Sequence, residues 1–186
     1  MKTLLISLAL ASAAIAVPAV AQTLPPAVIV IVDMDQVFQT SAAGKTAQAE
    51  LKTRLDGIQA RVASLRTSFG AEEQTLAKTR PTAAGPAATA WETKARDFQT
   101  RKTQAEQELA KRDQDFQASR QFVLKQINDG AQPIITTIMK ERGASIALAE
   151  GATLQHSASI DVTTDVVARL DKSLPRVSST AVAPAK

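Results

Sequence analysis

The sequence predicts an α+β fold in which a small β-rich body, built from both ends of the chain, carries a long antiparallel helical hairpin. A β-branched run at residues 28–32 precedes a helix-forming stretch without proline, and residues 80–86 then break that stretch with two prolines. A second helix-forming stretch of similar length follows. Because two helices joined by a short break fold back on each other, we expect the last part of the chain to return to the first strand.

The N-terminus is predicted to be a secretory signal peptide. Lys2 precedes an apolar stretch at residues 4–17, and Ala19-Val20-Ala21 is a small-x-small cleavage site. Cleavage after Ala16 is the alternative. The apolar stretch is shorter than the roughly 20 residues that span a bilayer. We therefore expect export and cleavage after Ala21, which leaves a chain without cysteine whose stability depends on burial and self-association.

The first strand is expected at residues 28–32, where Val and Ile alternate without a polar residue, as in strands covered on both faces. Asp33 and Asp35 follow it, and we interpret them as helix-capping residues beside a short helical turn at residues 35–39. Thr40 or Ser41 is expected to cap the first arm helix, which then runs to about Lys78.

This first arm has the heptad spacing of a coiled coil, so it must pack on a partner helix. Its apolar residues recur at steps of four and three, and we call them the hairpin seam: Leu51, Leu55, Ile58, Val62, Leu65 and Phe69.

The second arm is expected from about Ala87 to Asp129, after a tip at residues 79–87. Its heptad register is mixed: Lys102, Arg112 and Ser119 fall in line with Phe98 and Phe116. An unpaired buried charge is costly, so we predict that one face of this arm stays exposed to solvent and presents both apolar and basic side chains.

After Gly130, the pattern predicts a separate helix that starts at Pro133 and ends at Gly143. The remaining expected elements are a strand at residues 145–150, a third at 153–156, an extended piece at 160–162 and a closing helix at 163–172. We thus divide the mature chain into a body (22–40 and 130–174), a hairpin arm (41–129) and a disordered tail (175–186).

Positive charge is concentrated on the predicted arms. Residues 41–128 contain fifteen Lys and Arg against ten Asp and Glu. A solvated coiled-coil surface explains most of this excess, and a surface for anionic lipid or lipopolysaccharide is the alternative. Its candidate contacts lie near the tip: Lys78, Arg80, Lys94 and Arg96. Nucleic acid is not expected as a partner, because the aromatic residues form no stacking platform.

The sequence contains no complete catalytic or cofactor motif, so we expect neither an enzyme nor a cofactor. Gly44-Lys45-Thr46 resembles the end of a phosphate-binding loop, but Gln39 stands where that motif requires glycine. His156 is the single histidine and cysteine is absent, so a zinc site would lack its usual ligands.

The chain resembles the Skp, or OmpH-like, family of periplasmic chaperones for outer-membrane proteins. The resemblance rests on the strand at 28–32 followed by Asp33-Met34-Asp35-Gln36-Val37-Phe38, on residues 41–45 opening a helix, and on residues 146–148 and 160–170 at the far end. It implies a periplasmic homotrimer whose small sheets join into one body, with helical hairpins around a cavity that holds unfolded outer-membrane β-barrel proteins without ATP.

On this interpretation, two groups of residues acquire roles. The candidate client contacts on the second arm are Phe98, Lys102, Leu109, Arg112 and Phe116. The candidate oligomer residues of the body are Val28, Val30, Val32, Ile146 and Leu148. Two alternatives share the helices but need no client cavity: a structural coiled-coil protein that tethers envelope components, and an anionic-lipid-binding envelope protein.

Overall fold

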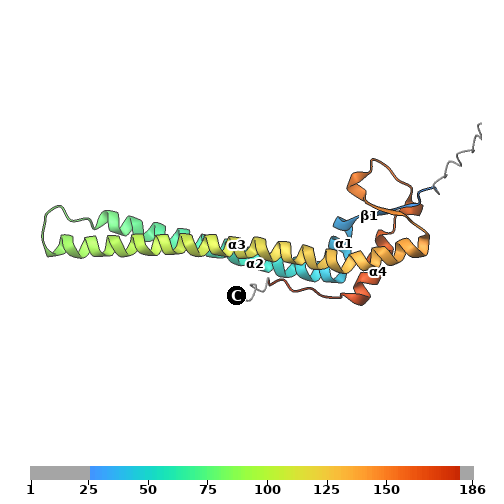
Figure 1. Ribbon diagram of the computed structural model, residues 1–186. Helices are drawn as coiled ribbons and strands as arrows, with labels where there is room; N and C mark the ends of the chain where they lie inside the picture. The colour runs from blue at the N-terminus through green and yellow to red at the C-terminus, as the bar shows by residue number, and fades with distance from the viewer. Residues whose placement is uncertain (1–25, 181–186) are drawn as a thin grey trace, which may run out of the picture.

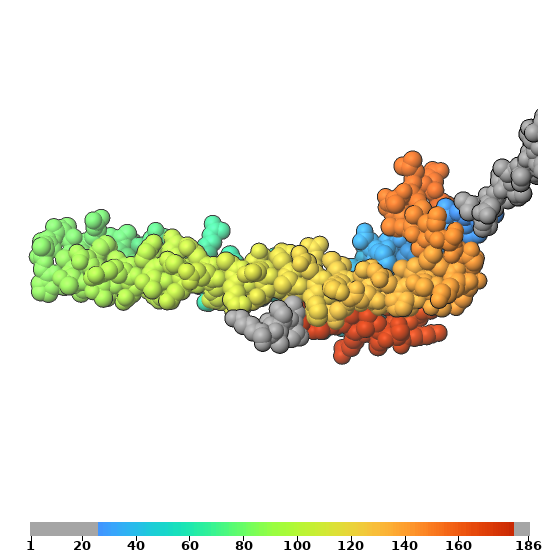
Figure 2. Space-filling view, viewed as in Figure 1, coloured from blue at the N-terminus to red at the C-terminus, as the bar shows by residue number. Residues whose placement is uncertain are grey.

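The computed structural model describes residues 26–180, and it confirms the predicted α+β class. The elements follow in the order β1 (Ile29–Val32), α1 (Met34–Thr40), α2 (Ala42–Lys78), α3 (Pro86–Arg142), β2 (Ile146–Ala149), the 3₁₀ helices η1 (Glu150–Ala152) and η2 (Ala158–Ile160), and α4 (Thr163–Ser173). Helices α2 and α3 lie side by side as a long rod, and the other elements gather at one end (Figure 1). Figure 2 shows the resulting slender arm and broader base. The predicted signal peptide and its cleavage after Ala21 lie outside the described residues.

The sheet of the body joins the two ends of the chain. Strands β1 and β2 are parallel, with Ile29 opposite Ile146 and Val32 opposite Ala149. Parallel neighbours need a long crossover connection, and here the whole hairpin forms it. An isolated bridge joins Ile31 to Asp161 on the other side of β1.

The prediction of a third strand at residues 153–156 is wrong. The segment between β2 and α4 consists of η1, η2 and irregular turns. Leu154 within it is fully exposed. A strand needs a partner edge and a face to bury, and this segment has neither among the described residues.

Two capped turns connect β1 to the arm. The carboxylate of Asp33 accepts a hydrogen bond from the Gln36 N–H at 2.8 Å, and Ser41 Oγ accepts one from the Gly44 N–H at 3.1 Å. These contacts confirm Asp33 and Ser41 as capping residues. A Cβ added at Gly44 would stand 1.7 Å from the carbonyl oxygen of Phe38. The close approach of α1 to α2 therefore requires glycine at this position.

The tip of the arm is a short turn between Lys78 and Pro86. Gly85 has a φ of 149°, a conformation that favours glycine, and Pro86 occupies the first turn of α3, where its missing N–H costs nothing. The chain thus reverses at the predicted break, and the hairpin is antiparallel.

The predicted end of the second arm near Asp129, with a new helix from Pro133, is wrong. Helix α3 continues through Pro133 to Arg142. Pro133 lies on the exposed face, whereas Ala131 and Ile138 are fully buried in the base. Burial of that face keeps the helix continuous although the proline removes one backbone hydrogen bond.

The hydrophobic core lies at the base, where the arm helices meet β1 and α4. The predicted closing helix is confirmed as α4, and its apolar face is buried there through Val166 and Leu170. The other principal members are Val30, Val32, Val37, Ala47, Leu51, Val123, Ile127, Ile138 and Val162. Among residues 26–180, the two arm helices beyond this base pack only on each other.

After α4 the chain turns back along the arm (Figure 1). We call residues 175–180 the strap. Val177 packs at the edge of the core, and Ser179 is only 5% exposed. A disordered tail was expected from Pro175, but this part of it lies against α2 and α3, because its backbone and hydroxyl groups find polar partners on both helices. Residues 181–186 lie outside the described part of the chain.

Candidate functional site

The hairpin seam divides into a packed row and an open row. Leu51 and Leu65 are buried and Ile58 is partly buried, whereas Leu55 and Val62 are 38% and 44% exposed. Helix α3 lies alongside α2 and covers the side of α2 that bears Leu51 and Leu65. Leu55, Ile58 and Val62, spaced by three and four residues, are neighbours on one helix face. They form an apolar surface that we call the flank stripe.

The packed row continues outward in an aromatic pair. Phe69 of α2 and Phe98 of α3 meet edge to face, with ring centroids 5.7 Å apart. Phe98 is only 7% exposed, so its predicted availability as a client contact is corrected: it is part of the arm's own packing. Of the other candidates, Lys102, Leu109 and Phe116 are partly buried and Arg112 is exposed.

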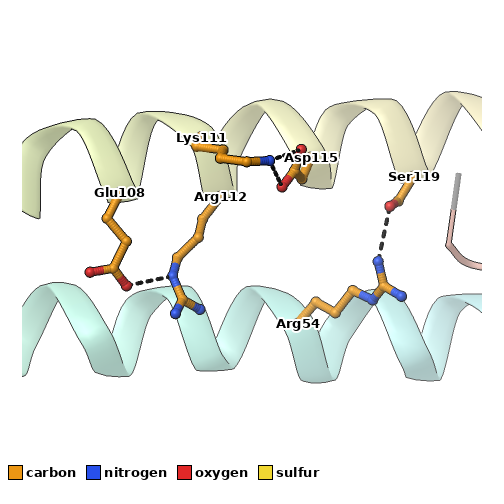
Figure 3. A network of polar contacts seen from close by, with 6 residues as sticks. All are labelled: Arg54, Glu108, Lys111, Arg112, Asp115 and Ser119. Carbon is orange, nitrogen blue, oxygen red and sulfur yellow. Dashed lines mark hydrogen bonds and ion pairs between the residues drawn. The ribbon is translucent and has the colours of Figure 1, made fainter. Parts of the chain in front are cut away.

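Two of the three polar residues that interrupt the heptad register of α3, Ser119 and Arg112, have side-chain partners. Buried Ser119 accepts a hydrogen bond from Arg54 Nη1 at 2.9 Å. Glu108 accepts one from Arg61 Nη2 at 2.9 Å and one from Arg112 Nε at 2.8 Å. Figure 3 shows Arg54 and Arg112 in the space between the two helices. Hydrogen bonds from Arg61 and then Arg112 hold the pKa of Glu108 below its ordinary value, since they favour the carboxylate.

A shallow pocket of about 260 Å³ opens between α2 and α3 beside Arg54 and Arg112. It is lined by Ile58 and Phe116 together with the charged residues Arg54, Arg112 and Asp115. Gly57 adds no side chain, and a Cβ there would meet nothing within 4 Å. The pocket adjoins the flank stripe through Ile58, so apolar residues and charged residues of both signs lie side by side.

The four basic residues near the tip are exposed, but they do not form one cluster. Arg80 lies over the Trp91 ring, with its guanidinium carbon 5.6 Å from the ring centroid. Lys94 lines a hollow between α2 and α3, whereas Arg96 lines a hollow on α3 alone, as expected because residues two apart on a helix do not face each other. With Lys78 at the end of α2, they spread positive charge around the tip.

The predicted oligomer residues also divide in two. Val30 and Val32 are buried in the core of their own chain, so the structure corrects their assignment to an interface. Leu148 is partly buried. Val28 is exposed, and Ile146 is 41% exposed on β2, whose outer edge has no strand neighbour among the described residues. The free β2 edge and these two side chains therefore form the open part of the sheet.

Within residues 26–180, no cluster of three or more His, Cys, Asp or Glu side chains is arranged to hold a metal ion. His156 lies beside one carboxylate, with its Nε2 3.8 Å from Glu150 Oε1, and it also interacts electrostatically with Asp161. Over the same range, no helix is both long enough and apolar enough to cross a membrane.

The strap makes polar contacts with both arm helices. The side-chain amide of Gln126 on α3 donates to the Ser178 carbonyl at 2.8 Å and accepts from the Ser178 N–H at 3.1 Å. On α2, Glu50 accepts a hydrogen bond from the Ser179 hydroxyl. Arg54 Nη2 lies 3.4 Å from the same hydroxyl. Arg54 thus links the strap to Ser119 of α3.

The sequence did not predict the contact site of the strap on α2 and α3. Arg54 lies beside the seam and Gln126 beside a buried isoleucine, and neither belongs to a motif. Val177, an apolar residue three positions after Leu174, is the one signal that the segment after α4 packs on the protein.

Comparisons with known proteins agree with this geometry. A family model described as outer membrane protein (OmpH-like) matches residues 28–170. The fold is similar to a crystal structure from Caulobacter crescentus CB15, described as a candidate outer membrane chaperone (OmpH-like), with a TM-score of 0.70 and 23% sequence identity. The alignment covers 84% of this chain and 92% of the other. A comparison with curated proteins found no match.

Proposed function

This chain belongs to the OmpH-like outer membrane protein family, and we propose that it is an ATP-independent periplasmic chaperone that holds unfolded outer-membrane β-barrel proteins. In this proposal the hairpin arm (residues 41–129) captures the client and the body (residues 22–40 and 130–174) assembles three copies. The arms then surround a cavity in which the client is kept from aggregating.

The observation that carries the proposal is the flank stripe. Leu55, Ile58 and Val62 expose apolar surface on a projecting arm, and the pocket beside them adds the charged residues Arg54, Arg112 and Asp115. An unfolded barrel presents alternating apolar and polar side chains. Contacts of both kinds are each weak, but several arms acting together retain a client by avidity while every single contact remains easy to release.

Assembly into a homotrimer follows from the family resemblance, and the open side of the sheet supports it. Ile146 is exposed on β2, whose outer edge has no described neighbour, and Val28 is exposed just before β1. Exposed apolar strand edges are rarely left uncovered, because they pair with other chains. Contact between bodies would cover this edge and leave the arms free.

The test is dilution of a urea-denatured outer-membrane β-barrel protein into buffer without nucleotide, followed by light scattering. We expect the wild-type chain to suppress aggregation and the Leu55→Gln/Val62→Gln double variant to lose most of this effect. Leu154→Gln is the matched control, because it removes an exposed leucine from the body instead of the arm. Aggregation at the same rate with and without the wild-type protein would exclude the holdase function.

A lipid-binding role is the second candidate, and the stacked Arg80–Trp91 pair at the basic tip favours it. Tryptophan and arginine side by side suit the boundary of a lipid headgroup layer. Changing Lys78, Arg80, Lys94 and Arg96 to Gln is expected to abolish binding to vesicles containing anionic phospholipid or lipopolysaccharide. If such binding is lost while barrel holding is unchanged, the tip has this second role.

The structural tether differs from the chaperone in how its arms are arranged. Arms of a tether would zip into a closed bundle, whereas arms of a holdase stay apart. Cross-linking from positions along both arms to a bound, unfolded barrel would separate the two, because a closed bundle would give only links between arms.

A further inference from the structure

Gln126 binds the strap through the backbone of the strap. The Gln126 amide forms both a donor and an acceptor hydrogen bond with the main chain of Ser178, at 2.8 and 3.1 Å. A side-chain amide that pairs with a peptide N–H and C=O in this way makes no demand on the side chain of the bound residue. Such a contact is suited to chain segments of many sequences.

The contacts around this pair are of the same adaptable kind. Arg54 Nη2 donates to Thr180 Oγ1 at 2.6 Å, and Glu50 accepts from the Ser179 hydroxyl. On the other side, Val177 places a small apolar side chain at the edge of the core. The site therefore takes one apolar anchor, one stretch of backbone and short hydroxyl side chains, in that order along the bound segment.

We propose that this site, formed by Glu50, Arg54 and Gln126, binds a non-helical segment of an unfolded client, and that the strap occupies it in cis as a built-in competitor. The proposal rests on the holdase function proposed above and adds a defined site at the root of the arm. The client segment replaces the strap, using its own backbone at Gln126 and an apolar side chain in place of Val177.

The composition of the strap agrees with a displaceable occupant. Apart from Val177 its side chains are proline, arginine, serine and threonine, so little apolar surface holds it. Gln126, Ser178 and Thr180 stand where water can compete, since the hydrogen bonds of Ser178 and Thr180 are exposed. The strap covers a site on the same helix pair that bears the flank stripe, so its release enlarges the client surface toward the base.

The test uses full-length variants that detach the strap. Ser178→Pro removes the N–H that pairs with Gln126, and Val177→Asp removes the apolar anchor from the other end. The probe is a fluorescent peptide with the sequence of residues 174–180, followed by anisotropy. If the strap covers the site about nine-tenths of the time, each variant binds the peptide about tenfold more tightly than the wild-type chain.

Adding Gln126→Ala to Ser178→Pro is expected to remove the gain, whereas Gln117→Ala, an exposed glutamine nine positions earlier on α3, leaves it intact. The same peptide with an N-methylated amide at Ser178 is expected to bind poorly to all variants. Thermal unfolding of each variant shows whether the base remains folded. If either Ser178→Pro or Val177→Asp fails to fold, the test uses the other variant.

The outcomes separate this inference from the holdase function. If the wild-type chain keeps a denatured barrel soluble but neither variant gains affinity for the peptide, the strap is only a structural brace and the inference is wrong. A gain that persists with Gln126→Ala overturns the assigned site. If no variant holds the barrel but the Gln126-dependent gain is present, the holdase function fails while the peptide site stands.

Discussion

Phe69 and Phe98 pack edge to face across the hairpin, with ring planes at 88° and centroids 5.7 Å apart. This is the favourable geometry for an aromatic pair, since the edge of one ring meets the electron-rich face of the other. It lies far from the core at the base, so it stabilises the outer arm, where few other large apolar side chains are buried.

Replacing Phe98 by Ala is therefore expected to destabilise the protein by about 3 kcal/mol, and a Phe69→Ala/Phe98→Ala cycle to give a coupling energy of about 1 kcal/mol. Urea unfolding followed by circular dichroism measures both. Val62→Ala, on the exposed flank, is the control with a small effect. Strictly additive losses would mean that the two rings do not interact.

Two glycines of α2 are expected to respond to alanine in opposite directions. Gly44→Ala places a Cβ 1.7 Å from the Phe38 carbonyl oxygen, so the α1–α2 junction must move and stability falls by about 3 kcal/mol. Gly57→Ala meets nothing within 4 Å and raises stability by about 0.5–1 kcal/mol, because alanine restricts the unfolded chain. Thermal melts of the two variants check this, and equal effects would contradict it.

Acid is expected to weaken the arm. Hydrogen bonds from Arg101 lower the pKa of Glu72, and hydrogen bonds from Arg61 and Arg112 lower that of Glu108, from an ordinary value of 4.5. A carboxylate with a depressed pKa stabilises the fold fully above its ordinary pKa and loses this contribution as the pH falls through the folded-state value.

The melting temperature should therefore stay level above about pH 5 and fall below about pH 4 on this account. Glu108→Gln should start lower at neutral pH and lose less on acidification than the wild-type chain. High salt is expected to reduce the difference between the two, because the ion pairs of Glu108 with Arg61 and Arg112 are solvent-accessible. Parallel pH profiles for the two proteins would show that Glu108 does not contribute.

Self-association is expected to depend on the open side of the sheet. Sedimentation velocity should show a trimer for the wild-type chain at micromolar concentration, and Val28→Lys/Ile146→Lys should yield monomer, because two charges would be buried at the joined bodies. Leu154→Lys, at a fully exposed body position, is the control. A wild-type monomer under these conditions would rule out the trimer.

Much of the fold followed from local sequence patterns. The β-branched run became β1, Asp33 and Ser41 became helix caps, and the two prolines near residue 83 marked the tip of the hairpin. Each of these depends on interactions within a few residues. The error at Pro133 has the opposite cause, since burial of Ala131 and Ile138 by distant segments outweighs the local effect of the proline.

The candidate site was harder to predict than the fold. The heptad pattern identified Leu51 through Phe69 as apolar neighbours, but it did not say that α3 would cover one row and leave Leu55 and Val62 open. Phe98 looked like an available residue in a mixed register, and its partner Phe69 lies on the other arm.

The sequence by itself determined the helical arms, their break, the strand before them and the resemblance to the OmpH-like family. The tertiary structure alone decided which face of each arm is covered, that α3 runs unbroken into the base, and that the strap lies on Gln126 and Arg54. The physical reason is range: propensity and capping act between neighbours in the chain, whereas burial and the hydrogen bonds of the strap join residues that only the folded hairpin brings together.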